Sequence, residues 1–474
     1  MVQKIFKYFR LSAFIAILKQ QSMGNKFKSL ILLGGDILIM YLSLYLALLI
    51  RYDGRFTAEL WQRHLGPFAI IFFIWFLIFY ISSLYNLKLA SNDTAFYRRL
   101  ARSFLAATLL SIIFFYLAPP SGITPKTNFF VFVAVFAILL IGWRRLFNLV
   151  LKSYLPKNNL AIIGQHPLIK EIVADLKQKP QLGFNISFIA SEALADRELD
   201  GVPVYDNLAA LPDLIAKRKI NNIILASAPA SQELRALLFE CLPLKITFIN
   251  LDDFYETIAG KIPLEVLNQM WFLENLNEGN KSGFDLFKRL ADLILALIIF
   301  LVTLPFWLII ALIIKLESHG PVFFVQTRAG ERGKNFRMIK FRTMKIEGND
   351  QTPTADGDHR VTRFGSFLRQ SRLDEIPQVL NIIKGEMSFV GPRPERPELI
   401  AALEKQVPFY RERMLVKPGV TGWDQISGEY HSPSYEDTMK KLQYDLYYIK
   451  NRSIYLELSI ILKTIATVLS RAGR

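Results

Sequence analysis

The stretch RLADLILALIIFLVTLPFWLIIALIIKLES, residues 289–318, decides how the chain meets a membrane. Thr303 is the only polar residue between positions 293 and 314, a length that suffices to cross a bilayer. Pro305 removes one intrahelical hydrogen bond near the middle and clashes with the preceding turn. Two interpretations are therefore open. The helix either spans with a kink, or it is re-entrant over about residues 291–314, with the Thr303 hydroxyl supporting the freed carbonyls.

Charged residues flank both ends of this stretch. In the re-entrant interpretation, Lys288, Arg289 and Lys315 lie at one interface near anionic headgroups. Asp292 is costly in hydrocarbon, so we expect it to pair with Lys288 or Arg289. A kinked span is the commoner outcome for such a run. It would place the basic block that follows outside the cytoplasm, against the usual distribution of Lys and Arg.

The composition limits the class of protein. The chain has 474 residues, enough for two or three domains, and its 52% hydrophobic content is too high for an ordinary soluble protein. A net charge of +16 together with long apolar runs favours anionic lipid and phosphate substrates, and we expect no nucleic-acid partner. Cys241 is the single cysteine, so no internal disulfide can form, and its apolar neighbours indicate a core position.

The N-terminal third has the pattern of a membrane region. Residues 1–28 form a basic N-terminal segment, and residues 29–158 are expected to contain four transmembrane helices. Lys and Arg gather in the N-terminal segment, in the second loop and after the fourth span, where Arg144 and Arg145 lie. Both ends of this region are therefore expected in the cytoplasm. The apolar segments are residues 30–50, 67–84, 104–118 and 129–143, of which the last two are short for a span.

Residues 159–274 alternate short apolar runs with helical patterns, which predicts a small parallel α/β domain. Gly164 follows the first strand, where a dinucleotide fold places its first glycine, but His166 and Ile169 replace the other two. The domain is therefore interpreted as Rossmann-like, without an intact dinucleotide fingerprint. The expected strands are residues 160–163, 186–190, 223–226 and 246–249, and the expected helices are residues 168–178, 208–217 and 232–240.

The last block, residues 283–474, concentrates basic residues around two adjacent acids. Asp374 and Glu375 precede an expected helix over residues 377–384, with Pro377 in its first turn and Gly385 after its end. For an isolated Asp-Glu pair, favourable charge at a helix start would be a sufficient explanation. The bases that suit phosphate contacts are Lys340, Arg342, Arg360, Arg363, Arg369, Arg372 and Arg393.

Several motifs of this block closely resemble the bacterial sugar transferase family, the monotopic phosphoglycosyl transferases, from about residue 288 to the C-terminus. In order, they are a Lys-Arg-x-x-Asp sequence before the apolar stretch, KFRTM at 340–344, LDE at 373–375, GPRP at 391–394 and KPG at 417–419. The set is specific, whereas any one motif alone would be weak. The N-terminal regions resemble the extension of the family's long members.

That resemblance implies a fold and a reaction. The fold is a membrane protein, an α-helical bundle plus α/β, with a C-terminal catalytic domain that carries a re-entrant helix. The reaction transfers a sugar 1-phosphate from a UDP-sugar to polyprenyl (undecaprenyl) phosphate and releases UMP, the first step of surface polysaccharide assembly. Asp374 would be the nucleophile that forms an aspartyl phosphosugar, and Glu375 would assist it. Both acids are candidates to hold Mg²⁺, which takes one or two carboxylates plus substrate phosphates.

The resemblance also assigns substrate contacts and a location. The expected substrate-binding residues are Lys340, Arg342, Arg360, Arg363, Arg369, Arg393 and Lys417. Because UDP-sugars are cytoplasmic, the catalytic domain should face the cytoplasm from the bacterial inner membrane, which requires the helix to break at Thr303 and Pro305 and return. Glu429 stands where many members have arginine, so another base would have to take its place.

Two other functions are compatible with parts of the sequence. A membrane-anchored nucleotide-sugar dehydratase or epimerase would explain an α/β domain after four spans, but the missing glycines and the absence of a following Tyr-x-x-x-Lys pair count against it. A lipid-linked sugar transporter would explain the apolar content and leave the basic block unexplained. The sequence does not identify the sugar, and it leaves homo-oligomerisation open.

Overall fold

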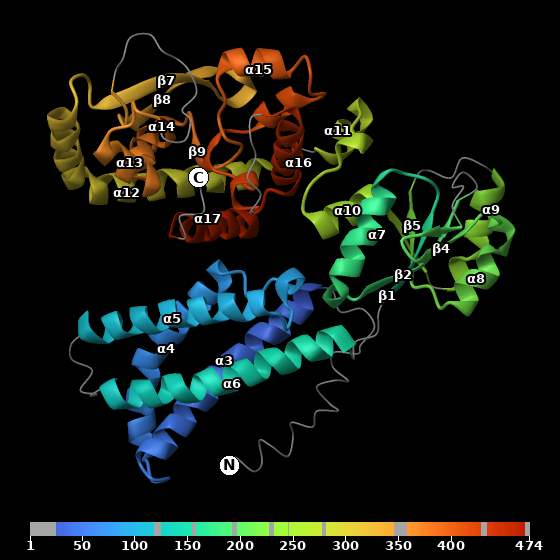
Figure 1. Ribbon diagram of the computed structural model, residues 1–474, viewed down its shortest axis with the longest axis horizontal. Helices are drawn as coiled ribbons and strands as arrows, with labels where there is room; N and C mark the ends of the chain where they lie inside the picture. The colour runs from blue at the N-terminus through green and yellow to red at the C-terminus, as the bar shows by residue number, and fades with distance from the viewer. Residues whose placement is uncertain are drawn as a thin grey trace. The chain divides into compact units, whose positions relative to one another are not determined.

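The computed structural model describes residues 25–117, 125–153, 158–191, 197–226, 232–244, 246–276, 281–345, 358–427 and 434–469. The chain divides into two compact units, Met1–Phe254 and Tyr255–Arg474. The first contains a bundle of long helices and a parallel sheet, and the second contains the apolar stretch and the acids (Figure 1). Most of the basic N-terminal segment lies outside the described residues, as does Glu429.

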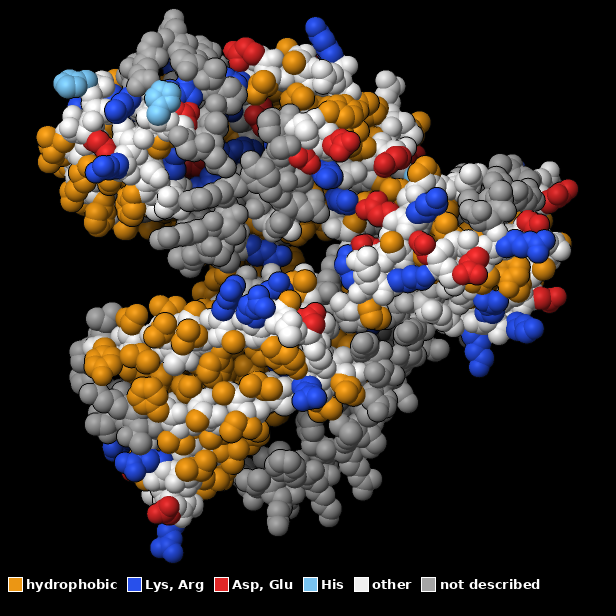
Figure 2. Space-filling view, in the orientation of Figure 1, with side chains coloured by type: hydrophobic (Ala, Val, Ile, Leu, Met, Phe, Trp, Pro, Cys, Tyr) orange, Lys and Arg blue, Asp and Glu red, His pale blue; other side chains and the backbone are white. Residues whose placement is uncertain are grey.

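Four long helices, α3 (Asn25–Arg51), α4 (Ala58–Ile81), α5 (Thr94–Leu117) and α6 (Pro125–Ser153), form the N-terminal bundle. Each is long and apolar enough to cross a membrane. Polar residues extend α5 and α6 at their ends, so both helices are longer than their apolar runs indicate. Aromatic side chains fill the bundle core, and hydrophobic side chains also cover its outer surface (Figure 2). Such a surface is consistent with a membrane-bound protein.

One basic residue counted as a loop charge in the sequence lies inside this bundle. Arg144 is 1% exposed and forms an ion pair with Asp36 of α3, and it also donates to the backbone oxygen of Leu84 at 2.8 Å. The use of Arg144 to orient the fourth span is therefore wrong. Because α6 continues to Ser153, Arg144 occupies the helix interior, where a buried charge requires a partner.

The sheet of the first unit has the strand order β3-β4-β2-β1-β5-β6, and β4, β2, β1, β5 and β6 are all parallel. This is the doubly wound arrangement expected from the alternating pattern. The strands β3 and β4 were missed in the sequence, because they are short and β4 contains a proline. Cys241 is buried in the core beside the sheet, as predicted. The strands are β1 (Asn158–Ile163), β2 (Phe184–Ala190), β3 (Glu198–Leu199), β4 (Val202–Tyr205), β5 (Asn222–Leu225) and β6 (Thr247–Asn250), and the helices are α7 (Leu168–Gln178), α8 (Leu211–Lys217) and α9 (Gln232–Glu240). The helix α10 (Leu251–Ala259) begins in this unit and ends in the second.

The second unit is built around two small sheets. The strands β7 (Phe323–Ala329) and β8 (Asn335–Phe341) form an antiparallel hairpin, and β9 (Ser388–Val390) pairs in parallel with β10 (Gly419–Thr421). The acids lie on a 3₁₀ helix, η8 (Leu373–Gln378), which leads directly into α14 (Val379–Lys384). The remaining helices are α11 (Gln269–Asn275), α12 (Ser282–Glu317), α13 (Arg363–Gln370), α15 (Pro397–Leu403), α16 (Tyr435–Asn451) and α17 (Ile454–Leu469).

Residues 255–276, which the sequence assigns to the α/β domain, pack within the second unit. Ile262 and Trp271 are buried in one core with Tyr410 and Leu446. Glu256 accepts a hydrogen bond from Lys450 Nζ at 2.7 Å. The apolar residues of a short helix do not indicate which domain the helix packs against. The sequence pattern alone therefore could not locate the boundary between the α/β domain and the last block.

The helix α12 runs without interruption through Pro305. Figure 1 shows its ribbon changing direction before the chain enters β7. Thr303 Oγ1 donates to the oxygen of Ile299 at 2.7 Å, whereas the carbonyl that Pro305 leaves without its N–H partner belongs to Leu301. The expectation that the Thr303 hydroxyl supports the carbonyl freed by Pro305 is therefore wrong. A threonine that bonds four residues back instead favours a bend in the helix.

Both ends of α12 are fastened to the same unit. At the beginning, Lys288 Nζ reaches Glu457 Oε2 at 2.5 Å and Arg289 donates to the oxygens of Ile382 and Ile383. Asp292 accepts from the Phe389 N–H at 3.4 Å, so its expected pairing with Lys288 or Arg289 is wrong. At the end, Glu317 accepts from the Phe364 N–H at 3.0 Å. One core combines residues from both halves of the helix, namely Ala296, Trp307, Ile310 and Ile314, with Phe341, Leu368 and Ile382.

Candidate active site

Glu375 is surrounded by three basic side chains. Its Oε1 lies 2.7 Å from Lys340 Nζ, 3.5 Å from Arg393 NH2 and 3.8 Å from Arg372 NH1. Lys340 comes from β8, Arg372 precedes the 3₁₀ helix, and Arg393 lies in the loop after β9. Residues of the KFRTM, LDE and GPRP motifs, distant in sequence, thus converge on one carboxylate.

The neighbouring acid, Asp374, is in a different environment. It is 8% exposed, and its Oδ1 has no hydrogen-bond partner among the described residues. A buried carboxylate oxygen without a partner is costly, and such atoms in native proteins call for an explanation. A hydrogen-bond donor or a cation would satisfy this oxygen.

The two acids have opposite pKa shifts. Burial, and then the charge of Glu375, raise the pKa of Asp374 to about 6. Burial would also raise the pKa of Glu375, but the charges of Lys340 and Arg393 outweigh it and lower that pKa to about 2. Adjacent titratable groups whose pKa values are pushed apart are a mark of divided chemical roles. At neutral pH Glu375 is therefore ionised and paired with cations, and Asp374 is ionised with little solvation.

Backbone geometry sets the acids in place. Arg372 adopts a left-handed conformation, with φ of 58°, immediately before η8. Such conformations are strained for a residue with a side chain and cluster at functional sites. The α-helix expected over residues 377–384 begins only at Val379, because Pro377 and Gln378 belong to the 3₁₀ helix that includes the acids; it ends before Gly385, whose φ of 87° confirms the predicted stop. Asn381, fully buried, ties α14 to β8 by bonds to Ile339 N and Arg337 O.

The GPRP and KPG motifs contact each other through their backbones. A Cβ atom at Gly391 would lie 2.3 Å from the Lys417 oxygen, and one at Gly419 would lie 2.1 Å from the Gly391 nitrogen. Only glycine allows this approach, because any side chain would collide with backbone. The GPRP and KPG motifs therefore fix the position of one another, and through it that of Arg393.

Three other predicted substrate-binding residues form hydrogen bonds with groups other than the two acids. Arg342 is 5% exposed and donates to the oxygens of Ser318 and His319, which holds the end of α12. Arg360 makes a two-pronged contact with Asp358. Arg369 Nε donates to Thr343 Oγ1 at 2.8 Å, and its charge acts on Asp374 by lowering the carboxyl pKa.

The last two predicted substrate-binding residues are Arg363 and Lys417. Arg363 is exposed at the start of α13. Lys417 Nζ lies beside Gly385, where Arg289 also lies. The structure therefore brings Lys340 and Arg393 to Glu375, adds Arg372, and gives Arg342 a role in holding α12.

The carboxylates of Asp374 and Glu375 could supply oxygen ligands to Mg²⁺ but not a complete protein site. Asp374 offers an oxygen without a protein partner, and Glu375 offers a carboxylate already contacted by cations. Among the described residues, no group of three His, Cys, Asp or Glu side chains could hold a metal ion. Magnesium is commonly held by one or two carboxylates together with substrate phosphates, so these acids fit an ion that arrives with its substrate.

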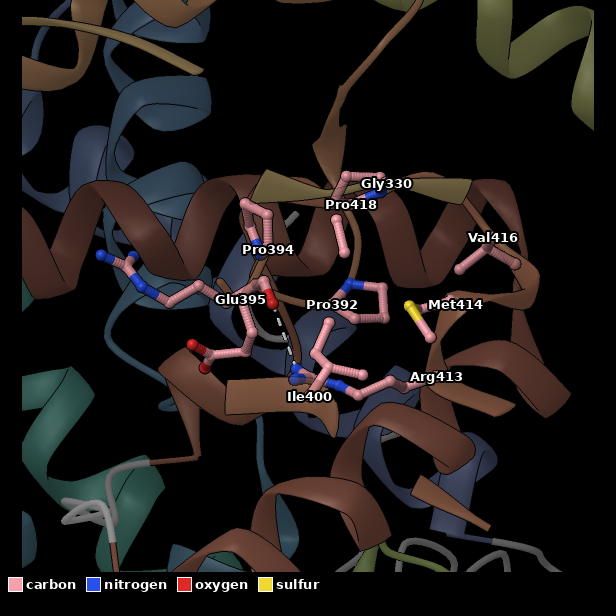
Figure 3. Close-up of a pocket in the computed structure, with 11 residues that line it drawn as sticks. Gly330, Pro392, Pro394, Glu395, Ile400, Arg413, Met414, Val416 and Pro418 are labelled. Atoms are coloured by element: carbon pink, nitrogen blue, oxygen red, sulfur yellow. Dashed lines mark hydrogen bonds between the residues drawn. The ribbon is translucent and has the colours of Figure 1, made fainter. Parts of the chain in front are cut away.

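The loop that carries Arg393 also borders a small hollow that is partly open to solvent. Figure 3 shows Pro392, Pro394, Pro418 and Met414 around it, and a dashed line marks the hydrogen bond from Arg413 to the loop. Arg413 is 5% exposed and forms a 2.7 Å ion pair with Asp445. Sequence analysis did not single out Arg413, since nothing local distinguishes it from exposed arginines nearby.

Comparison with known families gives two matches. The bacterial sugar transferase model matches residues 284–471, which include α12, both acids and the loop of Arg393. A CoA-binding domain model matches residues 80–248, which include most of the parallel sheet.

Similar curated proteins include enzymes named for sugar phosphate transfer. The chain is 37% identical over 243 residues to a UDP-N-acetylgalactosamine-undecaprenyl-phosphate N-acetylgalactosaminephosphotransferase of Aeromonas hydrophila, covering 51% of this chain and 56% of the relative. A UDP-glucose:undecaprenyl-phosphate glucose-1-phosphate transferase of Xanthomonas campestris pv. campestris is 42% identical over 42% of each chain. The Escherichia coli (strain K12) protein of that name is 32% identical over 65% of this chain and 67% of its own length. The matched part thus spans about half the length of the first two relatives.

Proposed function

The chain belongs to the bacterial sugar transferase family, and on that basis we propose that it transfers a sugar 1-phosphate from a UDP-sugar to undecaprenyl phosphate, with release of UMP. The single observation that carries the proposal is the Asp374–Glu375 pair: Oδ1 of the first acid has no hydrogen-bond partner among the described residues, and the second acid is enclosed by three cations. The names of the relatives support this class of substrates. The product would be the first lipid-linked intermediate of a surface polysaccharide.

The reaction proceeds in two displacements at one phosphorus atom. An oxygen of the Asp374 carboxylate attacks the phosphorus that bears the sugar, the bond from this phosphorus to the bridging oxygen breaks, and UMP leaves with that oxygen. An oxygen of undecaprenyl phosphate then attacks the same phosphorus, and Asp374 departs as a carboxylate. A covalent intermediate divides one difficult transfer into two easier steps.

The surrounding residues stabilise negative charge. Arg393 and Arg372 are 44% and 40% exposed, so their guanidinium groups can contact the phosphates while Glu375 holds them in place. Glu375 keeps Lys340 beside the reacting centre and, by its own charge, keeps Asp374 basic enough to attack. Bound Mg²⁺, held by Asp374, Glu375 and the substrate phosphates, would neutralise charge on the transferred group.

The helix α12 is proposed to be re-entrant, and α3 to α6 to be four spans with both ends in the cytoplasm. The attachment of Lys288 and Glu317 to one unit supports this arrangement, because a crossing helix would carry its two ends to opposite faces of the membrane. Large apolar side chains are exposed along α12 between these ends, as a membrane-embedded helix requires. The active site would then face the cytoplasm of the inner membrane, at the depth of a lipid phosphate.

A product assay tests the proposed activity. Membranes containing the protein, given a UDP-sugar, undecaprenyl phosphate and Mg²⁺, should yield UMP and a lipid-linked sugar. The variant Asp374→Asn should yield neither, and the exposed Lys334→Gln variant should match the wild type. Release of UDP in place of UMP would refute the proposal, because it would mean that the sugar moves without its phosphate.

A further inference from the structure

The loop that presents Arg393 is held almost entirely through its carbonyl oxygens. Pro392 and Pro394 flank Arg393 and have no N–H to donate. The oxygens of Pro392, Arg393, Pro394 and Glu395 each accept a hydrogen bond, from Gly419 N, Arg413 NH2, Arg328 NH1 and Ala329 N respectively. Since each of these oxygens has its own donor, the position of the Arg393 side chain depends on those donors.

Arg413 is the donor to the oxygen of Arg393 itself. Its NH2 lies 3.2 Å from that oxygen, its Nε lies 3.0 Å from Asp445 Oδ2, and its NH1 lies 2.7 Å from the Tyr410 hydroxyl. All three nitrogens are thus engaged in a planar, fixed arrangement that a flexible cation could not reproduce. Asp445, also buried, orients the guanidinium rather than contacting the loop.

Packing supplies only part of the restraint. The loop prolines border the hollow in Figure 3 together with Ile400 and Met414, so the apolar packing on that side is interrupted. Arg393 reaches Glu375 at 3.5 Å, compared with 2.7 Å for Lys340, and it is the more exposed of the two cations. A small movement of the loop would therefore remove Arg393 from the phosphate site before it affected Lys340.

We propose that Arg413, oriented by Asp445 and Tyr410, is a positioning residue that sets the reach of Arg393 toward the transferred phosphate by holding the Arg393 carbonyl. The inference rests on the proposed function, because it presumes that Arg393 contacts a substrate phosphate. Arg413 acts through the backbone of Arg393 and does not touch the reacting atoms.

A double-mutant cycle tests this. The pair Arg413→Met and Asp445→Leu removes both buried charges together, which avoids leaving either one unpaired. We expect it to lower kcat/KM for the UDP-sugar roughly 10- to 100-fold, the loss expected from a misplaced binding group. In an Arg393→Gln background the same pair should cause less than a threefold further loss, because its effect passes through Arg393.

Controls separate positioning from stability. The pair Glu256→Leu and Lys450→Met removes another ion pair of α16, and it should leave kcat/KM per folded enzyme unchanged even where the unfolding temperature falls. If the first pair prevents folding, Arg413→Lys replaces it. Lysine keeps the charge opposite Asp445 but cannot satisfy three partners. The fall in kcat/KM that Arg413→Lys causes should likewise vanish in the Arg393→Gln background.

Two results would overturn the positioning role. One is that the fall in kcat/KM caused by the Arg413 variants multiplies with that of Arg393→Gln, and the other is that the Arg413 variants keep the wild-type kcat/KM. If the wild type itself releases no UMP, the proposed function fails before any variant is compared.

Discussion

Lys340 Nζ and Glu375 Oε1 lie 2.7 Å apart, and this contact joins a strand of the β7–β8 hairpin to the 3₁₀ helix that carries both acids. Lys340 is 17% exposed and Glu375 is 10% exposed, so the pair is largely shielded from solvent. Because Glu375 is neutralised in this way, Asp374 beside it can remain a partly buried carboxylate with an unpartnered oxygen. The following predictions depend on this division between the two acids.

The rate should depend on the ionisation of Asp374. Its pKa of about 6 means that kcat/KM should fall as the pH drops below about 6, because only the carboxylate can attack phosphorus. The charge of Lys340 lowers this pKa, so Lys340→Gln should move the acid limb of the pH–rate profile to higher pH. A profile of UMP release measures both effects. The exposed Lys334→Gln should leave the limb in place, and an unmoved limb in Lys340→Gln would contradict the assignment.

The acids should have opposite effects on stability. The raised pKa of Asp374 means that its charge destabilises the fold above about pH 6, and this penalty disappears as the pH falls below its usual pKa near 4. Asp374→Asn should therefore raise the free energy of unfolding at pH 7.5 by about 1–3 kcal/mol, with the gain lost near pH 4.

The pKa of Glu375 is lowered, so its charge stabilises the fold above its usual pKa near 4.5, and this contribution is lost as the pH falls toward about 2. Glu375→Gln should therefore destabilise the protein at pH 7.5. Denaturant titrations at several pH values measure both variants. Changes of the same sign in the two variants at neutral pH would contradict the account.

Arg342 should behave as a structural residue, unlike Arg393. Arg342→Met removes charged hydrogen bonds to the oxygens of Ser318 and His319, which should lower the free energy of unfolding by about 1–3 kcal/mol. The folded fraction should keep its KM for UDP-sugar. Arg393→Gln should raise that KM with little loss of stability, since Arg393 is 44% exposed. A raised KM in a stable Arg342→Met variant would restore Arg342 as a substrate contact.

The topology can be tested with single cysteines after Cys241→Ala removes the native thiol. A cysteine at Lys334 in the β7–β8 hairpin should resist an impermeant maleimide in intact cells and react after permeabilisation. A cysteine at Arg55, between α3 and α4, should react in intact cells. Labelling at Lys334→Cys in intact cells would mean that α12 spans the membrane. Pro305→Ala should increase that labelling, because it restores the N–H that proline lacks and so favours a straight helix.

Several regular elements of the first unit and the two acids were accessible from sequence because their signals are local. The apolar run before Gly164 predicted the strand β1, and the period of residues 168–178 predicted α7 with its observed bounds. Asp374, Glu375 and Gly385 were recognisable by spacing and motif. Lys340 and Arg393 followed from the same family motifs, and both reach Glu375.

The sequence could not predict which charged residues, far apart in the chain, contact one another in the fold. Arg342 and Arg393 are the same residue type in two family motifs, yet the first donates to backbone oxygens at the end of α12 and the second contacts Glu375. The pairing of Lys288 with Glu457 joins two elements far apart in the chain, and so does that of Asp36 with Arg144. The partners of these charges are selected by tertiary packing, which no local pattern encodes.

The central claim is that Asp374 becomes covalently attached to the phosphosugar. Protein incubated with a UDP-sugar but no undecaprenyl phosphate, then quenched in acid, digested and examined by mass spectrometry, should give a peptide with a sugar phosphate on Asp374. Asp374→Asn should give only the unmodified peptide. A wild-type enzyme that forms lipid-linked sugar and UMP but gives the adduct on Glu375 would contradict the account, as would one that gives no adduct at any time point.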